Sequence, residues 1–555
     1  MSYDPVALGI QWDRLISIAD EVVSALVRTS FSTNVRESYD LSCVLFDSEA
    51  RSLAQGTYSV PSFTGTAQAT LQQLLHEFPA NTLEPGDVIM TNDPWIGTGH
   101  LFDINVMQPI FRDGSLIGYV MSITHLPDIG GIGFSATARE IYEEGLRLPP
   151  VKFLRRGEID PWVRRLIETN VRVPEQTLGD IFANVNCTTV GGRMVKDLMD
   201  EYAIKDLHPL AQAMLDFSER AIRNELRRIP AGPYSHAIMI EGSETPLDLR
   251  CTIEIRDGEV FADFAGSSDS VPSAINVPLC YTRAMTCHAI KCLTTPRIPN
   301  NEGSVRPIHA TAPPGCILNA APPSATGGRH VIGHFVQPLI FGALAEALPD
   351  RVQADSGMLN LINVQGRNRE GQGVSSIFFA SGGFGALKGI DGAATTPAPS
   401  NMTGSPIEVW ENLTGTLITS KALVADSGGP GQFRGGLGQR IEMINDSPNP
   451  LTVSCLAGRT EFPPAGILGG AAGRVRAVSI NGQTVSPKGR YALEPGDHLT
   501  TIEAGGGGFG DPRLRDRHRL EEDLVRGFVT PDGARECYGV VAETLQPERR
   551  GECQG

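Results

Sequence analysis

Glycine and proline divide the second half of the chain into short apolar runs, and this pattern limits the folds that are open to it. From Thr403 to Gly510 the apolar runs alternate with segments that favour tight turns. Short apolar runs separated by turns are typical of stacked antiparallel strands. Glycine and proline together form about 18% of the 555 residues, which is below the level that indicates disorder. We therefore predict a folded, β-rich C-terminal half.

The N-terminal part predicts helices and strands in alternation. Asp13 is a suitable N-cap for a first helix, because apolar residues follow it at helical spacing on one face. The apolar, β-prone run 40–47 predicts a buried strand, and 66–76 predicts a helix. The pentapeptide at 83–87 recurs at 493–497. In both copies proline and glycine stand where a type II turn requires them, and a strand-like run follows.

The remaining elements complete a mixed pattern. Helical spacing predicts helices at 161–170, 174–198, 209–228 and 281–293, and alternation predicts strands at 249–255 and 260–264. The tail from 513 predicts one or two short helices. The predicted fold class is mixed α and β, multidomain and β-rich in the C-terminal half. The predicted regions are a metal-site α/β region at 1–160, a helical region at 161–232, a mixed region at 233–400, a β-rich region at 401–512 and the tail at 513–555.

Charge and hydropathy exclude several classes of function. The formal net charge is −16 and no long run of like charges occurs, which argues against nucleic acid or an anionic membrane surface as a partner. No apolar stretch reaches the length of a membrane span, and the N-terminus has no signal-peptide core. The ten cysteines are scattered without a C-x-x-C motif, as expected for reduced, mostly buried thiols. We expect a cytoplasmic protein.

Histidine and aspartate concentrate in one segment that could bind a metal. His100 and Asp103 stand at a loop-to-strand junction, and His125 ends the apolar run 117–124. A strand pair joined by the turn at 112–114 would bring His125 back beside the other two residues. Imidazole and carboxylate are ligands that Zn, Mn or Fe accept, and a catalytic site takes three or four of them. By spacing alone, single satisfied histidines are the competing interpretation.

Other motifs carry weaker signals. Cys287, His288 and Cys292 lie on a predicted helix and could form a nucleophile or metal group, although packing of buried thiols is the simpler interpretation. The glycines at 428–436 lack the Lys-Ser/Thr of a phosphate-binding loop, so tight turns are favoured there. The run 505–510 predicts a flexible or tightly packed loop. No G-x-S-x-G motif is present.

Around His100, Asp103 and His125 the chain resembles the hydantoinase B family. This family includes the C-terminal half of 5-oxoprolinase, the caprolactamase beta subunit and the larger acetone and acetophenone carboxylase subunits. The similarity runs in order over most of the chain. Its motifs are Arg36-Glu-Ser-Tyr-Asp-Leu-Ser-Cys-Val-Leu-Phe-Asp47, Asn92-Asp-Pro94, His100 to Asp103, His125 to Gly131, Glu144-Gly-Leu-Arg-Leu-Pro-Pro-Val-Lys152, Asp426 to Gly438, Gly505 to Pro512 and Ala534 to Val541.

The resemblance implies a fold like that of hydantoinase B and one divalent metal ion (Zn, Mn or Fe) held by His100, Asp103 and His125. Asp40 is the expected fourth ligand, with Asp93 and Asp128 as alternatives or as partners that orient an imidazole. Asp128 or Glu144 is the expected general base.

The resemblance also implies a hetero-oligomer, in which a hydantoinase A-type subunit uses ATP to phosphorylate the oxygen of a cyclic amide or ketone. The activity expected of this chain is hydrolysis of the activated cyclic amide. The alternatives are ATP-dependent carboxylation of a ketone and a non-catalytic scaffold with a structural metal. The segment 58–65 departs from the family pattern, because it lacks the two histidines of H-I-P-V-H-x-G. If this segment lines the substrate pocket, the substrate of a relative cannot be transferred to this chain.

Overall fold

The computed structural model describes residues 3–540, and its N-terminal part is built on a seven-stranded antiparallel sheet. The strand order is β2-β1-β5-β4-β3-β6-β7. The strands are β1 (Leu41–Asp47), β2 (Ser52–Gln55), β3 (Val88–Thr91), β4 (Asp103–Arg112), β5 (Ser115–His125), β6 (Val151–Arg155) and β7 (Glu158–Ile159).

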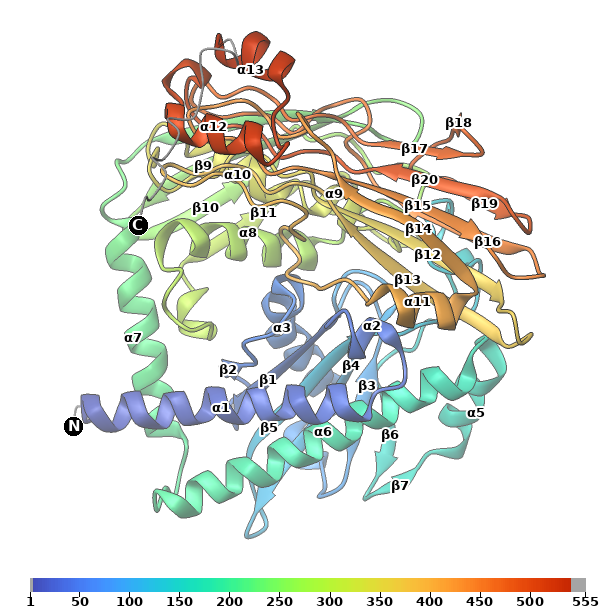
Figure 1. Ribbon diagram of the computed structural model, residues 1–555. Coiled ribbons are helices and arrows are strands. Elements are labelled where there is room, and N and C mark those ends of the chain that lie inside the picture. Colours follow the sequence, from blue (N-terminus) through green and yellow to red (C-terminus); the bar gives the residue numbers. More distant parts are fainter. Residues whose placement is uncertain (1–2, 541–555) are drawn as a thin grey trace, which may run out of the picture.

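Helices cover both faces of this sheet, and strand β1 shows why. All seven residues of β1 are buried. Leu41, Cys43 and Leu45 enter a core shared with the long helices α1 and α6, whereas Val44 and Phe46 enter the core on the opposite face, which contains residues of α3 and α8. A strand buried on both sides reads as a continuous apolar run rather than as an alternation. Figure 1 shows α1 and α6 crossing one side of the sheet, with α3 and α8 on the other.

The helices of this half mostly follow the predicted ranges. They are α1 (Pro5–Thr29), α2 (Thr33–Arg36), α3 (Pro61–Glu77), η1 (Ala80–Thr82), α4 (Ile141–Glu144), α5 (Pro161–Asn170), α6 (Pro174–Glu201) and α7 (His208–Leu226). The predicted start of the first helix is wrong. Asp4 caps α1 by accepting a hydrogen bond from the Ala7 amide, and Pro5 occupies the first helical position. Asp13 therefore lies inside the helix.

The middle of the chain carries a second, four-stranded sheet of order β11-β10-β9-β8. Burial alternates along β9, as the sequence pattern predicts. The elements are β8 (Pro233–Ile240), β9 (Leu247–Arg256), β10 (Glu259–Asp263), α8 (Leu279–Thr294), η2 (Glu302–Ser304), β11 (Ile308–Thr311), α9 (His330–Gly333) and α10 (Val336–Ala343).

Two further sheets form a sandwich in the C-terminal half, with orders β13-β12-β16-β19 and β14-β15-β20-β17-β18. They share a core that includes Val364, Trp410, Met443 and Leu499. The elements are β12 (Leu359–Arg367), β13 (Gly373–Ser381), α11 (Ile407–Thr414), β14 (Thr416–Leu423), β15 (Gln439–Asn445), β16 (Leu451–Leu456), β17 (Ala477–Ile480), β18 (Gln483–Thr484), β19 (Arg490–Leu493), β20 (His498–Ile502), η3 (Pro512–Leu514), α12 (Arg517–Val525) and α13 (Pro531–Tyr538).

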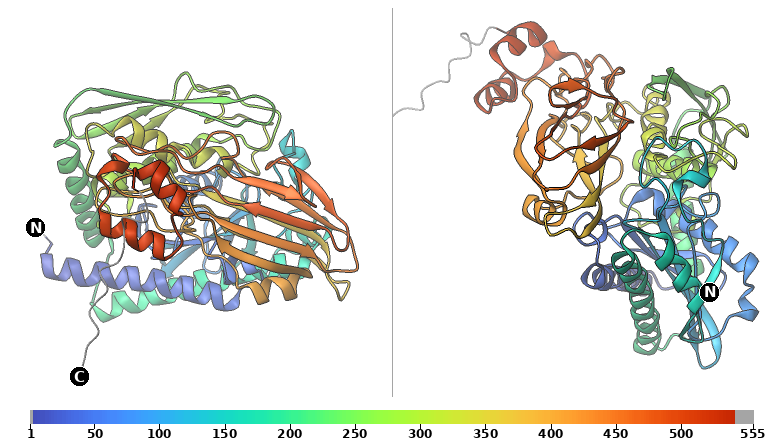
Figure 2. Two further views of the ribbon diagram at one scale, coloured as in Figure 1. Left: turned by 45° about the horizontal axis from the view of Figure 1, so that its top comes forward. Right: turned by 90° about the vertical axis from the view of Figure 1, so that its right-hand side faces the viewer.

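Figure 2 shows this orange and red C-terminal lobe beside the blue and green part of the molecule. The glycine-rich segments 428–436 and 505–510 of this lobe pack directly against each other, backbone to backbone. A Cβ atom on Gly505 would lie 1.7 Å from the Ser427 carbonyl oxygen, and one on Gly435 would lie 1.9 Å from the Gly506 carbonyl oxygen. The glycines at 428–436 and 505–510 thus allow chain segments to touch, which agrees with tight packing.

Three smaller predictions can be compared with the structure. The turns before β3 and β20 place Gly86 and Gly496 at φ +88°, as a type II turn requires. Five of the nine cysteines in the described part of the chain are buried, and Cys553 lies outside that part. None of the helices within residues 3–540 combines the length and hydrophobicity needed to cross a bilayer.

Candidate metal centre and adjoining cleft

The paired strands β4 and β5 bring the three predicted ligands together. Asp103 is the first residue of β4 and His125 is the last residue of β5, and the two stand opposite each other in the antiparallel register. The turn between the strands contains Asp113 and Gly114, both at positive φ. His100 lies in the loop just before β4. The strand pair predicted from the sequence is confirmed.

The ligand atoms of the triad lie within one coordination sphere. Nε2 of His100 is 2.8 Å from Oδ1 of Asp103, and Nδ1 of His125 is 3.3 Å from the same oxygen. One ligand atom from each residue can be chosen so that all three lie within 4.8 Å of one another, and all three side chains are buried. Oδ2 of Asp40, which directly precedes β1, lies 3.6 Å from Nδ1 of His125.

The hydrogen bonding of His100 leaves its ring and Asp103 suited to a cation between them. Its Nδ1 donates to the Gly327 carbonyl oxygen over 2.8 Å, so in the neutral ring Nε2 carries only a lone pair. Burial and the charge of Arg329 lower the pKa of His100 to about 4, so the ring is neutral near pH 7. Two electron-pair donors, Nε2 and Oδ1 of Asp103, then face each other at 2.8 Å, and neither has a hydrogen-bond partner. These residues fit a divalent ion that accepts nitrogen and oxygen ligands.

Asp103 is held so that one of its oxygens remains free for a ligand. Its Oδ2 accepts hydrogen bonds from the Thr98 hydroxyl and from Nη2 of Arg329, the latter over 2.6 Å. Burial acts to raise the pKa of Asp103, but His100, which is protonated at low pH, and Arg329 outweigh it and keep this pKa well below its usual value. The carboxylate is therefore ionised. For Asp40, burial dominates and raises the pKa to about 7.

A small cavity of about 30 Å³ lies against these side chains. The sequence did not single out three residues on its walls, namely Arg329, His330 and His334. Both histidines are neutral near pH 7, since burial lowers the pKa of His330 far below its usual value and that of His334 to about 3. The i, i+4 spacing of the two histidines at α9 is the sequence feature from which they could have been predicted to face the same site. Apolar walls include Leu359 and Leu361 of β12, together with Met402.

The other predicted carboxylates do not line this cavity. Both oxygens of Asp128 face Arg172, with 2.7 Å between Oδ1 and Nη1, and the Gly130 amide donates to Oδ1. Asp93 accepts from Nε of Arg147 and from the Trp95 amide. Both carboxylates thus tie loops together.

Glu144 lies one hydrogen-bonded peptide away from the predicted metal ligand His100. Its Oε1 accepts hydrogen bonds from the amides of Thr326 and Gly327, at 2.7 and 2.6 Å. The carbonyl oxygen of the same Gly327 accepts from His100. Burial raises the pKa of Glu144 to about 8. This side chain therefore fixes the peptide that orients the predicted ligand His100.

A much larger cleft, of about 650 Å³, lies next to the small cavity. A space of about 10 Å³ lies between the two regions, because its walls include His334 from the cavity together with Gln337 and Pro399 from the cleft. The segment 58–65 runs between them. Its Ser59 and Pro61 line the cleft, and its neighbours Val60, Ser62 and Phe63 line the cavity. The segment that departs from the family pattern therefore contributes to the walls of both spaces.

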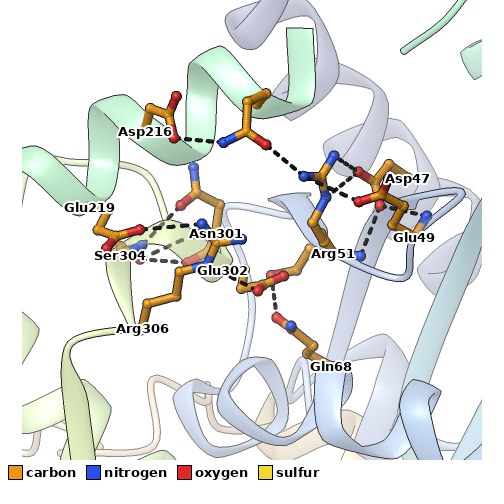
Figure 3. A network of polar contacts seen from close by, with 12 residues as sticks. Asp47, Glu49, Arg51, Gln68, Asp216, Glu219, Asn301, Glu302, Ser304 and Arg306 are labelled. Atoms are coloured by element: carbon orange, nitrogen blue, oxygen red, sulfur yellow. Dashed lines mark hydrogen bonds and ion pairs between the residues drawn. The ribbon is translucent and has the colours of Figure 1, made fainter. Parts of the chain in front are cut away.

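Polar residues on one side of the cleft belong to an extended network. Gln68 and Asn301 line the cleft. Figure 3 shows them beside two arginines, Arg51 and Arg306, that are surrounded by carboxylates. The Arg306–Glu219 ion pair joins the loop at 301–306 to α7. Arg51, which pairs with Asp47 at the end of β1, also donates to Gln212 of α7. Cys287, His288 and Cys292 also line the cleft and are not part of the metal triad.

Comparison with known proteins agrees with this architecture. The family described as hydantoinase B/oxoprolinase matches residues 4–512. A putative B-type component of a D-/L-hydantoinase from Pseudomonas sp. is 27% identical over 99% of this chain and 98% of its own length. The caprolactamase beta subunit of Pseudomonas jessenii is 30% identical, covering 97% of this chain and 96% of its own.

Solved structures give the same result at the level of the fold. The crystal structure of the ATP-dependent caprolactamase from Pseudomonas jessenii superposes with a TM-score of 0.90 at 28% identity, over 98% of this chain and 97% of that one. A nucleotide-free structure of acetone carboxylase superposes with a TM-score of 0.88 at 19% identity, over 97% and 80%. The chain therefore belongs to the hydantoinase B/oxoprolinase family.

Proposed function

We propose that this protein is the metal-dependent catalytic subunit of an ATP-dependent cyclic amide hydrolase. The observation that carries the proposal is the unprotonated Nε2 of His100 facing Oδ1 of Asp103 at 2.8 Å in a buried cavity. His100, Asp103 and His125 would hold one divalent ion, Zn, Mn or Fe, with Asp40 as the fourth ligand. Such an ion supplies Lewis acidity that polarises a carbonyl group or lowers the pKa of water.

The surrounding residues give this site a fixed geometry. Arg329 and Thr98 bind the oxygen of Asp103 that points away from the histidines. Glu144 positions His100 through Gly327. We assign Glu144 and Asp128 to positioning, since neither lines the cavity, and we leave the general base unassigned among the side chains that do.

ATP chemistry is assigned to a partner subunit of the hydantoinase A type. An amide carbonyl is a weak electrophile, and transfer of the γ-phosphoryl group to its oxygen would activate the carbon for attack by water. The glycine-rich segments 428–436 and 505–510 pack backbone against backbone. They therefore do not offer an open phosphate cradle. The names of the hydantoinase and caprolactamase relatives, which designate them as subunits, support a hetero-oligomer.

The experiment that tests the function combines this chain with its ATP-using partner. Hydantoin, 5-oxoproline and caprolactam are supplied with ATP, and ring opening is followed together with ADP release. We expect ring opening only with both subunits and ATP, and no ATP hydrolysis by this chain alone. Turnover that requires a ketone and bicarbonate would replace the proposal by carboxylation. Full activity after complete removal of metal would reject metal catalysis, and full activity of variants that lack the metal ligands would favour a scaffold.

A further inference from the structure

One face of helix α8 is turned toward the large cleft. Ala284, Cys287, His288 and Lys291 all line it, and their spacing of three and four residues places them on one side of the helix. Lys291 is only 7% exposed, so its side chain is largely desolvated. The metal centre does not use any of these four residues.

Lys291 lacks the partner that a buried cation normally requires. Its Nζ donates to the Ile298 carbonyl oxygen over 2.9 Å. Within residues 3–540, no carboxylate forms an ion pair with it. A buried charge is costly unless it is paired, and one neutral acceptor leaves two N–H groups of the ammonium available. In agreement, burial lowers the pKa of Lys291 to about 8.

The walls of the cleft suit a negatively charged ligand. Among the described residues that line it, none is aspartate or glutamate, although the whole chain has a net charge of −16. The second cation on the wall, Arg351, is already paired with Glu225 at 3.1 Å. In the neighbouring network, the carboxylates of Asp47, Glu219 and Glu302 are bound to Arg51 or Arg306 (Figure 3). In the described part of the chain, Lys291 is therefore the cationic group of the cleft that remains without an anion.

Neutral hydrogen-bonding groups accompany Lys291. His288 is uncharged near pH 7, because burial and the adjacent Lys291 lower its pKa to about 4. Gln68, Asn301 and Gln337 add amide groups that can donate or accept. An oxyanion that bound to Lys291 could thus also receive neutral hydrogen bonds.

We propose that Lys291 binds an anionic oxygen group of the molecule that occupies the cleft, so that the substrate of this subunit is an anion. This assignment rests on the proposed function only in treating the ligand as the substrate. The anionic group is either a carboxylate of the cyclic amide itself or the phosphoryl group placed on it by the partner subunit. In both cases the charge would anchor the ligand in the cleft beside the cavity of the metal centre.

The test measures binding of methyl phosphate and of acetate to the full chain by isothermal titration calorimetry. Three variants are compared with the native chain: Lys291→Met, which keeps the apolar stem, Lys291→Arg, which keeps the charge, and Lys388→Met as a surface-lysine control. We expect Lys291→Met to weaken binding about tenfold or more, because it removes the charge and the strong hydrogen bonds of a charged donor. Lys291→Arg should retain most of the affinity, and Lys388→Met should bind like the native chain. Equal binding by the native chain and Lys291→Met would overturn the proposal.

The two sources of charge are separated by the choice of probe. Much tighter binding of methyl phosphate than of acetate would indicate a phosphoryl group, and comparable binding would indicate a carboxylate. The same titration in a His100→Ala variant distinguishes this inference from the metal proposal. Binding that survives His100→Ala and is lost in Lys291→Met supports the cleft site whether or not the metal centre is correct. Binding lost only in His100→Ala would place the anion at the metal and reject the role of Lys291.

Discussion

Asp103 and His125 are directly opposed residues of β4 and β5, with 3.3 Å between Oδ1 of the aspartate and Nδ1 of the histidine. Their separation is set by strand register rather than by a flexible loop. A shift of one residue in this pairing would turn one of the two side chains to the other face of the sheet. Two of the predicted ligands, Asp103 and His125, are therefore held at the ends of paired strands.

Replacing His100 by alanine should remove both bound metal and turnover. The change deletes the Nε2 donor and leaves Asp103 and His125 with too few partners for a divalent ion. Elemental analysis should give about one equivalent of metal for the native chain and almost none for the variant. His309→Ala is the control, since His309 is an exposed residue of β11 outside the cavity. A His100→Ala protein that keeps its full metal content would contradict the ligand assignment.

Replacing Glu144 separates positioning from general base catalysis. Glu144→Gln keeps an oxygen that can accept from the Thr326 and Gly327 amides, so we expect metal binding and turnover to persist. Glu144→Ala leaves two buried amides unpaired, at a cost of about 1–3 kcal/mol each, and should lower both stability and metal affinity. Denaturation midpoints and steady-state kinetics measure the two effects. A folded Glu144→Gln protein without activity would restore Glu144 as the base.

Replacing Asp128 should affect stability and leave the chemistry intact. Its carboxylate is fully buried and bound to Arg172, which is partly exposed. Asp128→Ala should lower the free energy of unfolding by about 1–3 kcal/mol, because the Arg172 and Gly130 amides lose their acceptor while the guanidinium can be hydrated. Urea denaturation of both single variants and of the double variant with Arg172→Ala gives the coupling energy. Loss of turnover at unchanged stability is the result that would favour a catalytic Asp128.

Anion binding in the cleft should weaken as the pH rises from about 7 to about 9. The pKa of Lys291 is lowered by burial to about 8, so its positive charge is present below that pH and is lost above it. The neighbouring groups do not titrate in this window, since the pKa of His288 is about 4, that of Cys292 about 11 and that of Cys287 about 12. Sulfate, whose charge is constant here, is the suitable probe for calorimetry. The Lys291→Arg variant should bind it equally at both ends of the range.

The sequence was informative where the relevant contacts are local. The apolar run before His125, the turn at 112–114 and the spacing from His100 to Asp103 predicted a strand pair, and this pair is what joins the three residues. Helix boundaries with proline at the first position were also predicted closely, as for α5 and α6. The start of α1 was missed because Asp4 and Asp13 are both acceptable N-caps. Only the hydrogen bond from the Ala7 amide to the Asp4 side chain, seen in the structure, shows that Asp4 is the cap.

Contacts between distant segments could not be predicted in this way. Arg329 lies 226 residues from Asp103 in the chain, yet its guanidinium binds the carboxylate over 2.6 Å. Nothing local to either residue encodes that contact. The glycines at 428–436 and 505–510 are a similar case. A side chain is excluded there because the backbone of another segment packs against each glycine, and that contact is visible only in the folded structure.

The small cavity at the proposed metal centre has walls from three parts of the chain: the N-terminal sheet, the helices around Tyr281 and Arg329, and the C-terminal segments that carry Leu361 and Met402. A ligand bound there is thermodynamically linked to the docking of all three. By mass action, an ion present at about a thousand times its dissociation constant would add about 4 kcal/mol to the stability of the docked state. A metal ion bound there would then stabilise the packing of these parts against one another, in addition to its role in the reaction.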